Sequence, residues 1–195
     1  QGREIISFLP GQVGTYPLPD FVLSDQTLDT VARTLRAFHD ATQGFLGGPW
    51  QWPAHEPIEV ICHNDFAPYN MLFEDGRLTG IIDWDLASPG PRVWDMGYAA
   101  YRFVPLTDPA NPDVTNPGVA EQARRLARFC DAYDKGIEPR AVAETAITIL
   151  RDLVAFIRRE AAAGDPAQTA VLERGDVDIY ERDIAYVEER LSLLC

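Results

Sequence analysis

The sequence predicts a mainly α-helical domain of the α+β class that carries one small β-hairpin. Apolar residues recur at helical spacing over most of the second half of the chain. Two short apolar runs between residues 71 and 82 flank the turn sequence EDGR, which is typical of a hairpin. The 195 residues are 46% hydrophobic, which is enough to bury the core of one ordinary domain.

Five segments have the pattern of helices. The first is expected after Ser24 or Asp25, either of which can cap a helix. Its apolar side chains recur every three or four residues, at Leu28, Val31, Leu35 and Phe38. Pro139 suits the first turn of another helix. The later helices are expected at Trp94–Phe103, Val119–Tyr133, Pro139–Ile157 and Val177–Leu194.

Four short runs have the composition of strands. The first, REIISF at residues 3–8, stops at a Leu-Pro-Gly turn. The others are expected at 58–62, 71–73 and 78–82, with polar residues at the strand ends. After the sequence SPGP the pattern turns helical.

Charge and composition exclude several classes of partner. The formal net charge is −13, from 30 acidic and 17 basic residues, so the basic face that nucleic acid requires is not expected. No apolar run approaches the roughly 20 residues of a membrane helix, so no membrane partner is expected. Three scattered cysteines, at positions 62, 130 and 195, fit a reducing compartment, and we expect a cytoplasmic protein.

The stretch HNDFAPYN and the hairpin after it gather polar side chains. Asp65 lies in a tight loop, Asn70 follows five residues later, and Asp83 ends the second hairpin strand. A hairpin brings the loop before its first strand beside the end of its second, so these three side chains can converge. Amide and carboxylate oxygens suit Mg²⁺, and a further carboxylate can accept a proton from an attacking hydroxyl. This combination is typical of phosphoryl transfer.

The order His63, Asp65, Asn70 and an apolar strand ending at Asp83 resembles the catalytic core of the aminoglycoside phosphotransferase family. That family is related to the protein kinases, and the segment RVWDMGYA, with Asp95, matches its next stretch. The resemblance implies the helical C-terminal lobe of a protein-kinase-like fold over residues 1–195. REIISFLPG resembles the hinge at which such chains enter that lobe, so the N-terminal lobe is expected to be absent from this chain.

The resemblance also implies an activity and a set of site residues. Asp65 is the expected catalytic base, Asn70 and Asp83 are the expected Mg²⁺ ligands, and Ser7 and Leu9 the expected hinge contacts of ATP or GTP. The implied function is O-phosphorylation of a small molecule. Without a lobe to cover the phosphates, this chain alone is expected to be inactive.

The catalytic loop departs from the usual family pattern, which is close to HGDLHPGN. Asn64, Phe66, Ala67 and Tyr69 replace its first Gly, Leu, second His and last Gly. Tyr69 places a bulky side chain directly before Asn70. The only lysine is Lys135, far from the loop in sequence.

Other interpretations stay open. His63 more often supports such a loop through hydrogen bonds than acts in acid–base chemistry. Asp85 is either a further metal ligand or a solvated carboxylate. Asp83-Trp84-Asp85 also matches the D-x-D of metal-dependent glycosyltransferases, and a His/Asp metallohydrolase would need more histidines than the three present. A truncated or degenerate non-catalytic kinase-like module is the alternative from another class.

The acceptor is the least defined part of the prediction. Members of the resembling family phosphorylate aminoglycosides, choline-like amines, amino acids and sugars. The last helical segment is unusually acidic, which favours either a solvated face or the rim of a pocket for an amine-bearing, cationic hydroxyl compound. The carboxylates concerned are Glu160, Asp165, Glu173, Asp176, Asp178, Glu181, Asp183, Glu188 and Glu189.

Overall fold

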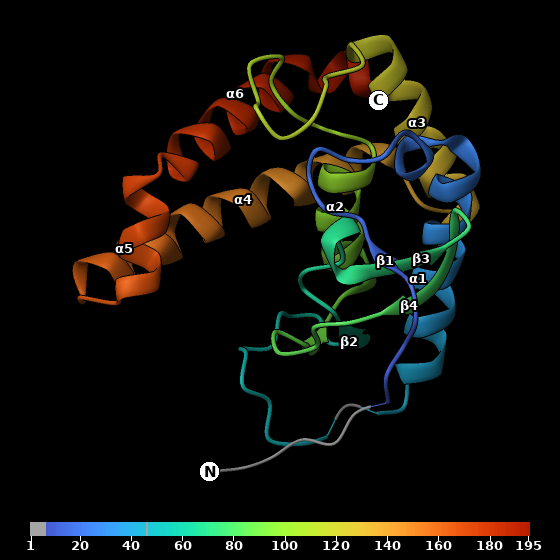
Figure 1. Ribbon diagram of the computed structural model, residues 1–195, viewed down its shortest axis with the longest axis horizontal. Helices are drawn as coiled ribbons and strands as arrows, with labels where there is room; N and C mark the ends of the chain where they lie inside the picture. The colour runs from blue at the N-terminus through green and yellow to red at the C-terminus, as the bar shows by residue number, and fades with distance from the viewer. Residues whose placement is uncertain (1–6, 46) are drawn as a thin grey trace.

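The computed structural model describes residues 7–45 and 47–195 and confirms a mainly helical fold with little sheet (Figure 1). The main helices are α1 (Asp25–Thr42), α2 (Arg92–Phe103), α3 (Val119–Tyr133), α4 (Pro139–Ala162), α5 (Pro166–Glu173) and α6 (Asp176–Leu194). The strands are β1 (Gln12–Val13), β2 (Val60–Cys62), β3 (Met71–Glu74), β4 (Arg77–Ile81) and β5 (Ser88–Gly90). Two short 3₁₀ helices are η1 (Asp20–Leu23) and η2 (Pro68–Asn70).

The helices form a packed body and an arm. α2 packs against α4, α1 packs against α3, and α4 runs beside α6. α5 joins the far ends of α4 and α6, so these three helices extend from the body in Figure 1. Their buried faces follow the apolar periodicity of the sequence, because that periodicity places one stripe of each helix against its neighbours. One continuous core joins α1, α2, α3, α4 and α6.

Two small antiparallel sheets flank the polar loop, residues 63–70, which connects β2 to β3. β3 lies between β1 and β4, and β2 pairs with β5. Asp75 and Gly76, both with positive φ, form the two-residue turn between β3 and β4. Leu9 packs over Gly80 of β4, because a Cβ added at Gly80 would lie 2.9 Å from Leu9 Cδ1 and would displace this exposed side chain.

Most predicted elements are confirmed, and the differences have local causes. The Ser24 side chain caps α1 by accepting a hydrogen bond from Thr27 N. Residues 3–6 of the first predicted strand lie outside the described residues, and its last two residues are not in a strand. The pairing with β3 is made instead by β1, beyond the Pro-Gly turn. β5 was not among the predicted strands, and it forms because β2 supplies its partner.

None of the described helices is long and apolar enough to cross a membrane.

Candidate active site

The buried side chain of Asp95 holds the start of the polar loop in place. Asp95, on α2, accepts hydrogen bonds from the backbone nitrogens of His63 (2.7 Å) and Asn64 (2.9 Å). His39 of α1 contacts the same carboxylate through Nε2 at 3.2 Å. Burial raises the pKa of Asp95, but the His39 contact, the two nearby imidazoles and the backbone bonds outweigh it and hold the pKa below its usual range. The loop therefore starts from an ionised clamp.

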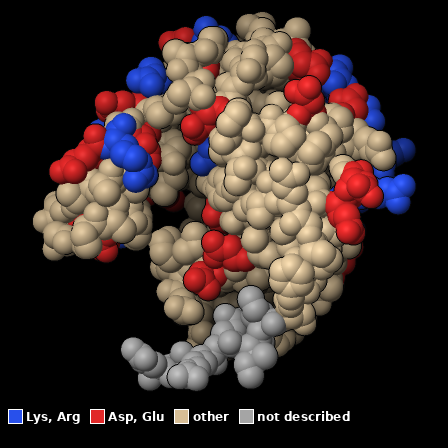
Figure 2. Space-filling model, viewed as in Figure 1, with Lys and Arg blue, Asp and Glu red and all other residues tan. Residues whose placement is uncertain are grey.

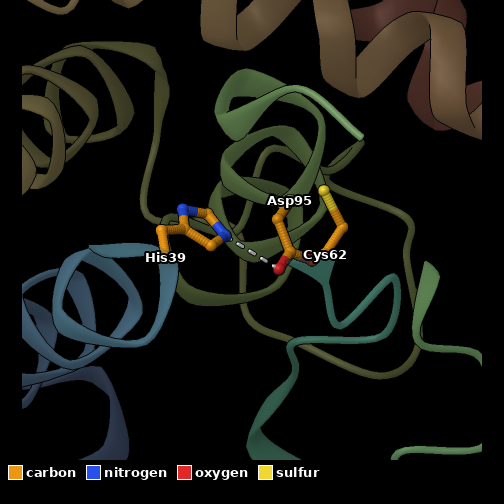
Figure 3. A group of neighbouring side chains, drawn as sticks. All are labelled: His39, Cys62 and Asp95. Carbon is orange, nitrogen blue, oxygen red and sulfur yellow. Dashed lines mark hydrogen bonds and ion pairs between the residues drawn. The ribbon is translucent and has the colours of Figure 1, made fainter. Parts of the chain in front are cut away.

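Figure 3 shows that Cys62 of β2 lies beside this pair, so that one ligand atom from each of three buried residues falls within 4.8 Å of the others. Such a group could hold a metal, but each member already has a protein partner. The Cys62 thiol donates to Pro91 O at 3.4 Å, and His39 Nδ1 contacts the Tyr133 hydroxyl at 2.7 Å. Burial also raises the pKa of the Cys62 thiol, which disfavours the thiolate that a metal needs. The group therefore suits a structural role.

His63 fixes the end of the hairpin relative to the loop. Its Nε2 donates to Ile82 O at 3.1 Å, and its Nδ1 accepts from Asp65 N at 3.3 Å. Asn64 adopts a positive φ of 66° and donates from Nδ2 to Leu86 O and to Ser88 Oγ. These contacts favour the supporting interpretation of His63, because both ring nitrogens are used to position backbone.

Asp65, the expected base, is largely buried and holds two donors. Its Oδ1 accepts from the Tyr69 hydroxyl at 2.6 Å, and its Oδ2 accepts from Asn70 Nδ2 at 2.8 Å. Burial raises the pKa of Asp65, and the bonds from Tyr69 and Asn70 oppose that rise. The carboxylate is thus fixed in one orientation between a phenol and an amide.

Asn70 and Asp83 meet at the open end of the hairpin. Ile82 N donates to Asn70 O at 3.0 Å, so the residue that follows Ile82 lies next to Asn70. Asp83 itself is exposed and has a positive φ of 62°. Because Asn70 uses Nδ2 to hold Asp65, its Oδ1 is the atom left for a cation. One amide oxygen and one exposed carboxylate fit a hard, oxygen-preferring ion such as Mg²⁺.

The sequence did not predict the polar cluster on the other side of Asp65. The Tyr69 hydroxyl lies 2.9 Å from the Tyr98 hydroxyl, which in turn accepts from Arg102 Nη2 at 3.2 Å. Tyr98 and Arg102 are four residues apart and share one face of α2. That spacing was visible in the sequence, but nothing there indicated that this face meets the loop.

Ser7 and Leu9, the expected nucleotide contacts, lie in an exposed segment beside the hairpin. The Leu9 side chain approaches Gly80 of β4, and the neighbouring Phe8 is 89% exposed. The structure holds no nucleotide that would test their roles, which stay predictions.

Residues 49–144 match the sequence model of the phosphotransferase enzyme family, and this segment contains Asp65, Asn70 and Asp83. This segment of the chain is therefore similar to that family. The resemblance inferred from the catalytic loop is therefore confirmed.

Solved structures show the same fold. A protein from Ralstonia eutropha JMP134 that is classed as an aminoglycoside phosphotransferase aligns with 93% of this chain and 71% of its own, with a TM-score of 0.64. The identity is only 16%, so this similarity concerns the kinase-like fold and not the substrate.

Two curated relatives match parts of the chain. The trifolitoxin immunity protein of Rhizobium leguminosarum bv. trifolii is 33% identical over 141 residues, which are 68% of this chain and 52% of that protein. The homoserine kinase of Zymomonas mobilis is 43% identical over 54 residues, which are 27% of this chain and 17% of the kinase. The chain thus spans about half the length of the first relative.

Proposed function

We propose that this chain contributes the catalytic loop of an ATP- or GTP-dependent O-phosphotransferase that acts on a hydroxyl group of a small molecule. One observation carries the proposal: the half-buried carboxylate of Asp65 is fixed by Asn70, whose backbone carbonyl accepts a hydrogen bond from Ile82, the residue before Asp83. The similarity to the phosphotransferase enzyme family supports a phosphotransferase that uses a nucleotide. In a protein of the kinase-like fold, residues 1–195 then correspond to the C-terminal lobe, entered at the hinge.

Each side chain has a distinct task in this proposal. Asp65 accepts the hydrogen bond of the acceptor hydroxyl and takes its proton as the oxygen attacks the phosphoryl group. Asn70 Oδ1 and the Asp83 carboxylate would hold Mg²⁺, which when bound neutralises charge on the transferred phosphate. The Asn70 amide nitrogen meanwhile keeps Asp65 in place. Ser7 and Leu9 would contact the nucleotide base through their backbone.

An amine-bearing acceptor such as an aminoglycoside is the more specific proposal. The net charge of −13 would attract a cation, and Figure 2 shows acidic side chains around the hollow between the helical arm and the rest of the molecule. Asp183 belongs to the acidic segment of the sequence but does not lie on that rim. Asp183 is fully buried and accepts bonds from Tyr101, Asn111 and Asp108 N.

Two substitutions distinguish the proposed base, Asp65, from the proposed metal ligand, Asp83. Asp65→Ala in the full-length protein should lower kcat by about 10²–10⁴-fold, the usual contribution of a positioned base, with little change in nucleotide affinity. Asp83→Ala should also weaken Mg²⁺-dependent nucleotide binding, measured by calorimetry. Glu74→Ala, at an exposed position of the same hairpin, is the matched control and should change neither. Near-normal turnover by Asp65→Ala would refute the mechanism.

A non-catalytic binding module is the second candidate, and one contact favours it. The Tyr69 hydroxyl occupies one oxygen of Asp65, where a simpler loop with glycine would leave that oxygen open. If this module had lost catalysis, nucleotide and Mg²⁺ would produce no phosphorylated acceptor from any member of a broad hydroxyl panel. Phosphoryl transfer to any panel member that is lost in Asp65→Ala would exclude the module.

A further inference from the structure

Arg102 lies in a box of aromatic rings on α2. Its guanidinium carbon is 4.7 Å from the ring centre of Tyr101, 5.4 Å from that of Tyr98 and 5.6 Å from that of Tyr69. These rings attract a cation through their electron-rich faces. A substrate ammonium cannot use the box, because the guanidinium already fills it.

The guanidinium has no carboxylate partner among the described residues. Its hydrogen bonds there go to the Tyr98 hydroxyl, from Nε at 3.4 Å and from Nη2 at 3.2 Å. Within residues 7–45 and 47–195, no acidic oxygen lies within 4.0 Å of it. A half-buried cation without an anion is costly, since it loses hydration and gains little in return.

Tyr16 supplies a second donor that lacks a partner. Its hydroxyl is buried and forms no hydrogen bond within the described part of the chain. The Tyr16 ring centre lies 6.2 Å from that of Tyr69, the ring that Arg102 also contacts, so the two groups border the same cluster. Burial raises the pKa of this phenol, and Arg102 is the charge that most opposes the rise. An exposed carboxylate, Asp113, also acts on Tyr16 but forms no ion pair with Arg102 in the described residues. A cation without an ion pair beside a hydroxyl without a hydrogen bond suits an anion.

The cluster lies on the acceptor side of the base. Asp65 Oδ2 faces Asn70, which the proposed function assigns to the metal and the nucleotide. Asp65 Oδ1 faces the opposite way, toward Tyr69, Tyr98 and then Arg102. An anion at Arg102 therefore belongs to the molecule that approaches Asp65 from the side away from the phosphates.

We propose that Arg102 and Tyr16 bind a carboxylate group of the acceptor, so that the substrate is a hydroxyl compound with an acidic group. The assignment rests on the proposed function only for the hydroxyl and its phosphorylation; the anion site can be tested without either. The planar guanidinium fork matches the two oxygens of a carboxylate. An amine-bearing acceptor fits this site only if it also carries a carboxylate. An aminoglycoside does not, so the carboxylate site favours an acceptor of another class, such as a hydroxy acid with or without an amine.

The experiment compares acceptors of equal length that differ in one group. Binding of 4-hydroxybutanoate, 1,4-butanediol and 4-amino-1-butanol to the full-length protein is measured by calorimetry without nucleotide. The hydroxy acid should bind at least about tenfold more tightly than the diol, as a charge-assisted hydrogen bond implies. Arg102→Gln should remove this difference, Arg102→Lys should keep part of it, and Tyr16→Phe should reduce it about threefold.

Controls separate this site from folding and from phosphate binding. Arg190→Gln removes another arginine that stacks on a tyrosine, Tyr186, and should leave the preference intact. Circular dichroism reports whether each variant is folded; should Arg102→Gln fail to fold, Arg102→Lys and Tyr16→Phe decide. Inorganic phosphate is titrated in parallel, because a phosphoryl group is the other oxyanion that could occupy the site.

Equal binding of the three compounds, tighter binding of the amine, or a preference that survives Arg102→Gln would each overturn the proposal. A loss of phosphate affinity alone in Arg102→Gln would do the same, since it assigns the site to the nucleotide. If the preference is present while Asp65→Ala leaves turnover unchanged, the carboxylate site stands and the catalytic mechanism falls.

Discussion

Asp95 and Asp183 are buried aspartates that each connect distant segments of the chain, and they differ in the kind of group that surrounds the carboxylate. Asp95 clamps the catalytic loop, and Asp183 clamps the arm helix α6 to Tyr101 and to the loop at 108–111. Both are fully buried, and each accepts three hydrogen bonds. Asp95 has imidazole neighbours, and its pKa is lowered; Asp183 has a phenol, an amide and a backbone N–H, and burial raises its pKa.

The comparison shows that hydrogen-bond number alone does not decide whether a buried carboxylate stays ionised. Burial acts against the charged form at both sites, and the neutral donors of Asp183 only reduce that effect. At Asp95 the imidazoles add a favourable charge interaction. The loop that carries the chemistry is therefore held by the more robust of the two anchors.

The largest expected effect is that of removing the loop anchor. Asp95→Ala leaves two backbone N–H groups and the His39 ring without their partner, and should lower the free energy of unfolding by about 3–5 kcal/mol. Urea denaturation followed by circular dichroism measures this. A loss below about 1 kcal/mol would mean that water or a shift of the loop replaces the carboxylate.

Asp183→Ala should be less damaging. It orphans the Tyr101 hydroxyl, the Asn111 amide and Asp108 N, and should cost about 2–3 kcal/mol. The same denaturation experiment tests it. A cost larger than that of Asp95→Ala would contradict the ranking of the two anchors.

The pH dependence of the free energy of unfolding also distinguishes Asp95 from Asp183. The raised pKa of Asp183 means that its ionisation opposes folding, so its contribution to stability improves as pH falls through this raised pKa toward the unfolded value of about 3.9. The lowered pKa of Asp95 means that its contribution is fully present above about pH 3.9 and is lost only below it.

Matched amides isolate the two contributions. From pH 7 to 4.5, the stability of the wild type relative to Asp183→Asn should rise, while that relative to Asp95→Asn should stay level. Thermal unfolding at several pH values provides the measurement. Parallel slopes for both pairs would show that the two carboxylates titrate alike.

The smallest effect on stability is expected for a solvent-exposed salt bridge. Arg124 pairs with Asp25 and Glu121 at the surface between α1 and α3. Arg124→Ala should leave the denaturation midpoint close to that of the wild type, because solvent and salt screen such pairs. A shift as large as that of Asp183→Ala would show that this network is a third anchor.

The sequence predicted the helices well because each buries a stripe of regular period, as Val177 to Leu194 does along α6. It also predicted the order of the loop residues, since the spacing from Asp65 to Asn70 and Asp83 follows from one loop and one hairpin. β5 and β1 were missed because a strand of two or three residues has no period of its own and exists only through its partner.

By itself, then, the sequence determined the fold class and the resemblance to the phosphotransferase family, and it proposed Asp65, Asn70 and Asp83 as site residues, all of which depend on local spacing. Only the tertiary structure decided that Tyr98 and Arg102 lie on the Tyr69 side of Asp65, that the Tyr16 hydroxyl lacks a partner within the described residues, and that Asp183 is buried while the other carboxylates of α6 are not. These facts depend on which helix face meets which loop. That choice is made by the packing of the whole core, in which residues more than 80 positions apart, such as Tyr101 and Asp183, come into contact.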